Sequence, residues 1–326
     1  MSLTIGVDVG GTKIAAGVVD EQGAVLSAVR QSSPKQSGEE LMGAVVEIVA
    51  ELRAQATAEV SGVGLSAAGF VSADRRHVLF APHLQWGDEP VADLLTERTA
   101  LPVVIENDAN AAAWAEFRFG AGRGIDDQLM VAIGTGVGGG IVLDGEIYRG
   151  GHGVAAEIGH IAFVPDGLPC PCGRRGCFEQ YASGTALQRR AREAAASGQA
   201  PQLLERAGGA PEAVTGQMVT SAAEAGDSDA VDLLAALGRD LGIGVASLVA
   251  VLDPSLVVLG GGVSEAGELL RAPVERALAD QITGGSRRPG PDVVVAALGN
   301  DAALVGVADP ARLGSRVRQA DPAATL

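Results

Sequence analysis

The chain opens with three apolar runs rich in Val and Ile, and this pattern constrains the fold more than any other feature. The runs are LTIGVDVG, KIAAGVVD and AVLSAVR, separated by the glycine turn GGT and the turn EQG. Short β-branched runs bounded by turn residues are typical of strands joined by hairpins. GEELMGAVVEIVAELRAQA follows, and its apolar residues recur at the spacing of one helix face. The sequence therefore predicts three hairpin-linked strands followed by an amphipathic helix.

Strand and helix patterns then alternate to the end of the chain. Strands are expected in VSGVGLSAAG, LPVVIEND, QLMVAI, GGGIVLDGEI, SLVVLG and PDVVVAAL. Helices are expected in VADLLTERTA, in DANAAAWAEFRFG with Asn107 or Asp108 as its cap, through roughly 182–197, 215–226 and 229–252, in SEAGELLRAPVERAL and in DAALVGVADPARL. This alternation indicates an α/β fold with a mixed sheet. The parts before and after about residue 109 both begin with a strand, a glycine turn and a strand, which hints at an internal duplication.

Composition narrows the class of protein. A content of 47% hydrophobic and 20% charged residues is typical of a globular protein. The length of 326 residues is enough for two domains with separate cores. A net charge of −16 argues against a nucleic-acid partner, because such a partner requires a basic face. The N-terminus enters a strand-like run at once, and no run of 18 apolar residues occurs. We therefore expect a cytoplasmic protein without a membrane partner.

All three cysteines, Cys170, Cys172 and Cys177, lie within eight positions of CPCGRRGC. An odd number of thiols leaves one unpaired, and the 170/172 pair closes a loop too short for relaxed disulfide geometry. Three clustered thiolates instead supply three of the four ligands that tetrahedral zinc requires. The fourth ligand could come from His160 or His152, and spacing alone does not choose between them; a metal-free cluster of reduced cysteines is the alternative. Such a closed site is structural, so its value lies in positioning nearby groups such as Glu157, His160 and Glu179.

Three glycine groups are candidates for binding phosphate. DVGGTK, residues 8–13, places glycines beside a carboxylate, a hydroxyl and an ammonium group, although an ordinary hairpin turn would also use glycines there. GTGVGG, residues 134–139, matches G-x-G-x-x-G, but a strand follows it where a dinucleotide site needs a helix. GGGVSEAGE, residues 260–268, runs from a strand into a helix, whose N-terminus could meet an anion. The set favours a nucleotide bound by two hairpins and one helix start over a Walker or Rossmann site.

Asp108 follows a strand in VIENDAN, next to Asn107. These two residues could simply cap the next helix. The carboxyl end of a strand is also where open α/β sheets place their ligands, and a carboxylate there can accept a proton from an attacking hydroxyl. Asp108 is therefore the candidate general base.

Taken together and in order, these motifs resemble the ROK family (repressor, open reading frame, kinase), and within it the bacterial glucokinases. The motifs are DVGGTK, ENDANAAAW, GTGVGGGI, EIGHI followed by CPCGRRGCFEQYASG, and LGGGVS. The cysteine signature C-x-C-G-x-x-G-C-x-E is met in full from Cys170 to Glu179, and the resemblance covers about residues 3–310. It implies the actin-like, ribonuclease-H-like ATPase fold, with two α/β domains around a central cleft. We expect residues 1–109 plus about 300–320 to form a small domain, residues 110–299 a large domain, and residues 314–326 a frayed tail.

The resemblance also implies a role for each matching residue. Asp108 matches the catalytic base, and the sugar-binding positions are Gly69, Asn107, Asp108, Glu157, His160 and Glu179. The first phosphate turn matches Asp8, Gly10, Gly11, Thr12 and Lys13, the second Gly134, Thr135, Gly136 and Gly138, and the adenosine side Gly261, Gly262 and Val263. The zinc ligands match His160, Cys170, Cys172 and Cys177, which favours His160 over His152.

The implied reaction is transfer of phosphate from Mg-ATP to the 6-hydroxyl of glucose, the entry step of glycolysis, by a homodimer or homotetramer. Other acceptors within the same family are mannose, fructose and N-acetylhexosamine, and polyphosphate is another donor. A sugar-sensing repressor of this family would carry a DNA-binding helix-turn-helix before the first phosphate turn. Asp8 already lies in that turn, so no room remains for one. A catalytically inactive sugar-binding module is disfavoured because the base and both phosphate turns are present.

Overall fold

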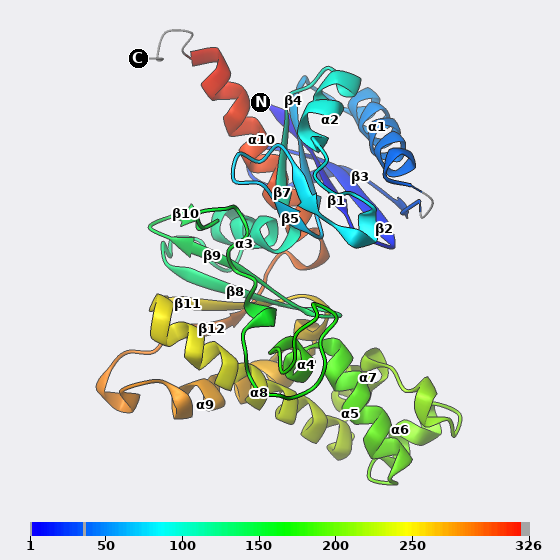
Figure 1. The fold of residues 1–326 in the computed structure, drawn as a ribbon, viewed down its shortest axis with the longest axis vertical. Coiled ribbons are helices and arrows are strands. Elements are labelled where there is room, and N and C mark those ends of the chain that lie inside the picture. Colours follow the sequence, from blue (N-terminus) through cyan, green and yellow to red (C-terminus); the bar gives the residue numbers. More distant parts are fainter. Residues whose placement is uncertain (1, 35–36, 321–326) are drawn as a thin grey trace.

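Two five-stranded mixed sheets form the frame of the computed structural model, which describes residues 2–34 and 37–320 (Figure 1). The first sheet has the order β3-β2-β1-β4-β7, with β1 Leu3–Val9, β2 Lys13–Val19, β3 Val25–Ser32, β4 Val60–Ala67 and β7 Val103–Asn107. The second has the order β10-β9-β8-β11-β12, with β8 Gln128–Ile133, β9 Val137–Leu143, β10 Glu146–Ile147, β11 Leu256–Gly260 and β12 Asp292–Val295. The expected α/β class with mixed sheets is confirmed.

The two sheets share one topology. In each, three antiparallel strands come first in the chain, and two later strands run parallel to the first. The equivalent strands are therefore β1 and β8, β2 and β9, β3 and β10, β4 and β11, and β7 and β12. The internal duplication suggested by the repeated strand, glycine turn and strand is borne out at the level of topology.

Helices lie outside and between the sheets (Figure 1). Helices α1 (Gly38–Gln55) and α2 (Val91–Thr99) cover one face of the first sheet, and α3 (Asp108–Phe119) and α10 (Ala302–Ala320) lie between the sheets. Helices α8 (Ser228–Leu252) and α9 (Glu268–Gln281) cover the far face of the second sheet. The same core extends into α4 (Glu179–Ala182), α5 (Gly184–Ala196), α6 (Pro201–Arg206) and α7 (Gly216–Glu224).

Short elements complete the chain. A small hairpin pairs β5 (Phe70–Val71) with β6 (Val78–Phe80). The 3-10 turns are η1 Pro82–Leu84, η2 Ile158–His160, η3 Pro211–Ala213, η4 Gly262–Ala266, η5 Gly285–Arg287 and η6 Gly299–Asp301. The third glycine group therefore enters η4 first and reaches α9 only at Glu268.

The alternation of β1 explains how α10 reaches the first sheet. Leu3, Ile5 and Val7 are buried toward α1, whereas Gly6 faces α10. A Cβ at Gly6 would lie 2.0 Å from the Leu304 carbonyl oxygen, and one at Gly64 of β4 would lie 1.9 Å from that of Val307. Because glycine has no Cβ, the helix backbone packs directly on the strands. Helix α10 therefore packs directly on the first sheet.

Helix α10 continues through Ala320, so the chain does not fray at Gly314 as expected; one glycine costs a helix only about 1 kcal/mol, and its neighbours Leu313 and Arg316 are good helix formers. The expected frayed residues 321–326 lie outside the described residues. Among the described helices, α8 is long and apolar enough to cross a membrane, but half of its apolar window is buried within the protein, as in a core helix.

Candidate functional site

Asp108 stands at the point where β7 ends and α3 begins. Asn107 is the N-cap of α3: its Oδ1 accepts the N–H groups of Ala109 at 3.0 Å and Asn110 at 3.1 Å. The Nδ2 of Asn107 donates to the carbonyl of Gly69 at 3.1 Å and to Asp108 Oδ1 at 3.1 Å. Asn107 therefore caps the helix and also fixes Asp108, so the capping and site interpretations of this pair are compatible.

The glycines of β9 let α3 and the segment before η2 pack closely on opposite faces of this strand. A Cβ at Gly138 would lie 3.1 Å from Ala109 Cβ, and one at Gly140 would lie 2.4 Å from Ala113 Cβ. On the opposite face of β9, a Cβ at Gly139 would lie 2.7 Å from the carbonyl oxygen of Ala156, directly before Glu157. The glycine-rich strand therefore packs against Asp108's helix on one face and Glu157's segment on the other. Gly138, a predicted phosphate residue, lies within the strand.

Burial and neighbouring carboxylates raise the pKa of Asp108. The pKa of Asp108 is raised to about 6, first by burial and then by the negative charges of Asp8 and Glu157; the N–H of Ala109 opposes the shift because it stabilises the charged form. Burial also raises the pKa of Asp8, opposed by the Ser66 hydroxyl, which donates to it at 2.5 Å, and by the charge of Lys13. A carboxyl group with a pKa near 6 is suited to general-base work close to neutral pH.

Glu157 directly precedes η2, and His160 is the last residue of η2. Burial raises the pKa of Glu157; the charge of His160 opposes this shift and that of Glu179 adds to it. The carboxylates of Asp8, Asp108, Glu157 and Glu179 therefore interact in a chain of like charges that links the first sheet to the cysteine loop.

Four soft-metal ligands converge at the cysteine loop. One ligand atom from each of His160, Cys170, Cys172 and Cys177 lies within 4.8 Å of every other. Sγ of Cys172 and Sγ of Cys177 are 3.6 Å apart, and His160 Nδ1 is 3.7 Å from Cys170 Sγ. A tetrahedral zinc ion with sulfur ligands at about 2.3 Å would hold its sulfurs about 3.8 Å apart. The residues therefore fit a zinc ion, and His160 is the histidine that completes the set.

Glu179 connects the cysteine loop to the second glycine turn. Its Oε1 lies 3.1 Å from Cys170 Sγ and 3.6 Å from His160 Nδ1. A Cβ at Gly136 would lie 2.5 Å from Glu179 Oε2, so the absence of a side chain at position 136 leaves room for this carboxylate.

The first glycine turn joins β1 to β2. Gly10 N–H donates to the Lys13 carbonyl at 3.0 Å, and the Ser33 hydroxyl donates to the Gly10 carbonyl at 2.6 Å. A Cβ at Gly11 would meet His83 Cβ at 3.2 Å. Thr12 and Lys13 are exposed. The turn is thus a closed hairpin whose polar side chains remain available to a ligand.

The second and third glycine groups meet at α5. Gly184 N–H donates to the Gly134 carbonyl at 2.8 Å, and the Thr185 hydroxyl donates to the Thr135 carbonyl at 2.7 Å. A Cβ at Gly184 would lie 3.2 Å from Val263 Cγ2. Gly261, with φ of +81°, lies against the backbone of Ile133. The structure therefore brings Gly134 and Thr135 close to the segment Gly261–Val263.

A cavity of about 190 Å³ adjoins the third glycine group. Its lining consists of Gly261, Ser264, Glu265, Gly267, Val295, Ala296, Gly299 and Asn300. Sequence reasoning found Gly261 but missed the residues after β12, because nothing in the GN dipeptide at 299–300 marks it as part of a site.

Sequence reasoning also missed a buried ion cluster behind Asp108. Glu106 is buried and pairs with Arg149 and Arg75. A charged residue inside an apolar strand, as in VVIEN, is a signal that a buried partner exists, although it does not say which.

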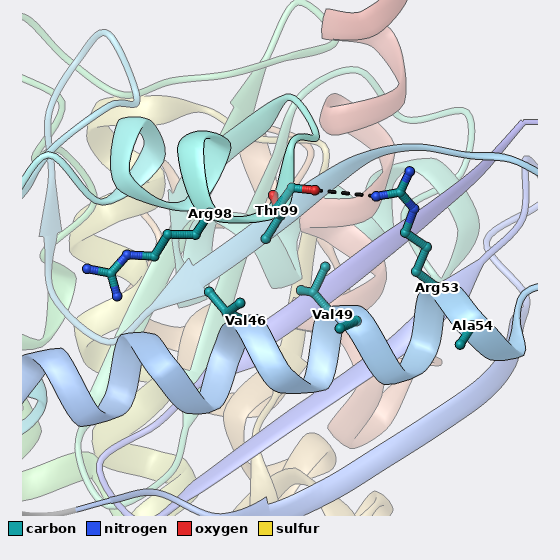
Figure 2. A pocket seen from close by; sticks show the side chains of 7 residues that line it. Val46, Val49, Arg53, Ala54, Arg98 and Thr99 are labelled. Carbon is teal, nitrogen blue, oxygen red and sulfur yellow. Dashed lines mark hydrogen bonds between the residues drawn. The ribbon is translucent and has the colours of Figure 1, made fainter.

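A separate cavity of about 320 Å³ lies between α1 and α2 (Figure 2). It is lined by Val46, Val49, Ala50, Arg53, Ala54, Arg98 and Thr99. Its two arginines are already engaged: Arg53 donates to the Thr99 carbonyl at 3.4 Å, and Arg98 forms a two-bond pair with Glu39. None of the predicted site residues lines it.

Comparison with known proteins places the chain in one family. The model of the ROK family matches residues 4–312. A glucokinase of Streptomyces coelicolor is 46% identical over 314 residues, which cover 96% of this chain and 98% of that protein.

Solved structures agree with this. A ROK family glucokinase from Streptomyces griseus, crystallised in complex with glucose and AMPPNP, is 48% identical with a TM-score of 0.87, covering 96% of this chain and 100% of that one. A ROK hexokinase from Thermus thermophilus is 36% identical with a TM-score of 0.77, covering 97% and 99%. The match across nearly the whole length, in sequence and in fold, means that this chain belongs to the ROK family and has its actin-like ATPase fold.

Proposed function

We propose that this protein is an ATP-dependent glucokinase, which transfers the γ-phosphoryl group of ATP to the 6-hydroxyl of glucose and releases glucose 6-phosphate and ADP. The observation that carries this proposal is the position of Asp108, a carboxylate with a pKa of about 6 between the first phosphate turn and the Glu157 segment. Its support from relatives is the similarity to glucokinases over nearly the full chain.

The base acts at the sugar. Asp108 accepts the proton of the 6-hydroxyl as the oxygen attacks the γ-phosphorus, and the bond from that phosphorus to the β-γ bridging oxygen breaks in line. Asn107 holds Asp108 Oδ1 and is itself held by Gly69, so the base is oriented before the sugar binds. Glu157, His160 and Glu179 bind the remaining sugar hydroxyls.

The phosphates bind at the glycine turns. Backbone N–H groups of Gly11 and Thr12 and of Thr135 and Gly136 provide the anion-binding surface, with Lys13 as the cation beside them. A magnesium ion bound with ATP would supply positive charge to the β- and γ-phosphates, and Asp8 is the carboxylate that would orient its water ligands. The cavity at Gly261–Asn300 receives the adenosine, with Ser264, Glu265 and Asn300 as its polar side chains.

Zinc is the structural metal of this proposal. His160, Cys170, Cys172 and Cys177 would hold it, and it would supply rigidity rather than reactivity. His160 turns Nδ1 toward the cysteines, which leaves Nε2 for a sugar hydroxyl, so metal binding would fix the tautomer that the sugar meets. A polar cage of this kind discriminates epimers because a misplaced hydroxyl leaves buried groups unpaired.

The test is sugar-dependent ADP release by the purified protein with Mg-ATP, compared across glucose, mannose, fructose and N-acetylglucosamine. We expect glucose to be the preferred acceptor, and Asp108→Asn to abolish the release. Preference for another hexose would change the acceptor and keep the reaction. Activity with polyphosphate in place of ATP would change the donor, and no activity with either donor would overturn the proposal.

Assembly and location stay predictions. We propose a homodimer or homotetramer in the cytoplasm, in which residues 1–109 plus about 300–320 move against residues 110–299 when the sugar binds. Analytical ultracentrifugation with and without glucose would test the assembly.

A further inference from the structure

Glu106 is a buried carboxylate with cations on one oxygen and the backbone of the catalytic segment on the other. Its side chain is only 5% exposed. Oε2 accepts Arg149 Nε at 2.8 Å and Nη2 at 2.7 Å, and Arg75 Nε lies 3.4 Å away. Two N–H groups of one guanidinium on the same oxygen form charge-assisted hydrogen bonds that hold Oε2 in place.

The other oxygen of Glu106 holds the start of α3. Oε1 accepts the N–H of Asn107 at 3.1 Å and the Nδ2 of Asn110 at 3.3 Å. Glu106 also pairs in register with Ser66, which pairs with Asp8, so the three polar residues form one row across β7, β4 and β1. The residues that set the position of Asp108 therefore depend on this carboxylate.

Arg149 begins the segment that ends at Glu157. The carbonyl of Arg149 accepts the N–H of Ala155 at 3.1 Å, which closes the segment into a loop. Within the loop, a Cβ at Gly153 would lie 2.6 Å from the Val71 carbonyl oxygen and from Ala73 N, so the loop lies directly on the β5–β6 hairpin. Ala156, with φ of +68°, has a backbone conformation that a non-glycine residue adopts only when its surroundings enforce it.

The loop therefore spans both halves of the site. Its end packs on β9 of the second sheet through Ala156, and its start is bound to β7 of the first sheet through Arg149. Asp108 follows β7 of the first sheet, whereas Glu157 lies in the segment that packs on β9 of the second sheet; the Arg149–Glu106 pair is a polar link between these two segments.

We propose that Glu106 and Arg149 are positioning residues for the sugar site. They hold the loop that ends at Glu157 in a fixed position relative to Asp108 at the start of α3. This inference rests on the proposed sugar kinase activity and adds two residues to its machinery. Neither residue is assigned a contact with substrate; both act through Asn107, Asp108 and Glu157.

The charges decide which variant is informative. Glu106→Gln would leave the partly buried Arg75 and Arg149 near each other with no carboxylate, which risks loss of folding. Arg149→Met keeps much of the aliphatic stem and leaves Glu106 paired with Arg75, so the fold should survive. Arg149→Lys keeps the charge but loses the two-bond geometry. Arg276→Met, at an exposed arginine of α9, is the matched control.

The kinetic test measures kcat and the KM values for sugar and ATP in the wild type and in Arg149→Met, Arg149→Lys and Arg276→Met. A misplaced site group can cost about 10²-fold in rate, so we expect kcat/KM for the sugar to fall about 10- to 100-fold in Arg149→Met, with the ATP KM little changed. Arg149→Lys should recover part of this loss, and Arg276→Met should match wild type. A KM for ATP that rises as much as the KM for the sugar, or an unchanged kcat/KM for the sugar, would overturn the proposal. Activity of the wild type would still uphold the kinase function.

A second readout does not depend on activity. Hydrogen–deuterium exchange followed by mass spectrometry should show faster exchange in peptides covering 150–157 and 107–110 of Arg149→Met than in wild type, with α8 unchanged. Unchanged exchange in both peptides would overturn the proposal even if the protein phosphorylated no sugar. An inactive wild type with the expected exchange difference would instead refute the proposed function and keep the positioning role.

Discussion

At the scale of single residues, the surroundings of Asp108 disfavour the charged form of its carboxylate. Asp108 is partly buried beside Asp8 and Glu157, so its charged form costs free energy in the folded state. Asp108→Asn removes that charge and keeps an oxygen for the Ala109 N–H. We expect kcat to fall by about 10²–10⁴-fold, as is typical when a general base is lost. Sugar-dependent ADP release at saturating substrate measures it, and near wild-type turnover would remove Asp108 from this role.

The same substitution should stabilise the protein. Because the folded pKa of Asp108 is raised, its contribution to stability is present below the pKa of the unfolded chain and is lost as pH rises through about 6. A shift of this size corresponds to as much as about 3 kcal/mol. Asp108→Asn should therefore raise the Tm above that of wild type by more at pH 8 than at pH 5. An equal Tm difference at both pH values would contradict the raised pKa.

The pH profile of the reaction tests the electrostatic origin of that pKa. A base works only when deprotonated, so kcat/KM should fall as pH drops through about 6. Asp8→Asn removes a negative neighbour and should shift this acid limb to lower pH, even if it also lowers the maximal rate. Profiles of both proteins from pH 5 to 8 decide the matter. An acid limb that does not move in the variant would mean that Asp8 does not set the pKa of Asp108.

At the scale of elements, glycines decide which segments can meet. Gly136→Ala would place a methyl group 2.5 Å from Glu179 Oε2, so the carboxylate must move away from the turn. We expect the sugar KM to rise at least severalfold. Gly87→Ala, at an exposed glycine with open space around its Cα, is the control and should match wild type. A normal sugar KM in Gly136→Ala would mean that Glu179 does not need this position.

The cysteine loop depends on its metal. Cys172→Ser removes one of four converging ligands, so the protein should lose zinc, as measured by inductively coupled plasma mass spectrometry. Because His160 and Glu179 are held by the same loop, the sugar KM should rise more than the ATP KM. Normal metal content together with a normal sugar KM would refute the structural-zinc proposal.

The elements also show why the sequence was informative in some places and not in others. Strands and long helices were predictable from periodicity, and Asp108 was predictable because chemistry collects at strand ends. Glu106 and Arg149 pair across 43 positions, and periodicity carries no information about such distant contacts. The β5–β6 hairpin and α6 are too short to give a pattern. The packing role of Gly138 was missed because the sequence does not distinguish a glycine that packs against a helix from one that binds phosphate.

At the scale of the whole molecule, Glu116 of α3 holds the segment that crosses from the second sheet to α10. Its carboxylate is fully buried and accepts three backbone N–H groups: Ala121 at 2.8 Å, Ala297 at 3.0 Å and Leu298 at 2.7 Å. Ala297 and Leu298 follow β12, and they lie between Ala296 and Gly299, which line the cavity assigned to adenosine. The Glu116 carboxylate therefore binds the central helix α3 to the segment that lines the cavity assigned to adenosine.

Glu116→Gln tests this tie. An amide offers one acceptor oxygen where the carboxylate offers two, and its NH₂ group would face a buried N–H. Each buried polar group left unpaired costs about 1–3 kcal/mol, so the free energy of unfolding should fall by about 2–4 kcal/mol in urea titrations. The ATP KM should rise more than the sugar KM, because the freed segment lines the adenosine cavity. Glu224→Gln, at an exposed glutamate of α7, should change neither quantity. Lower stability with an unchanged ATP KM would mean that Glu116 serves folding alone, and that the nucleotide side is held by the glycine turns without this crossing segment.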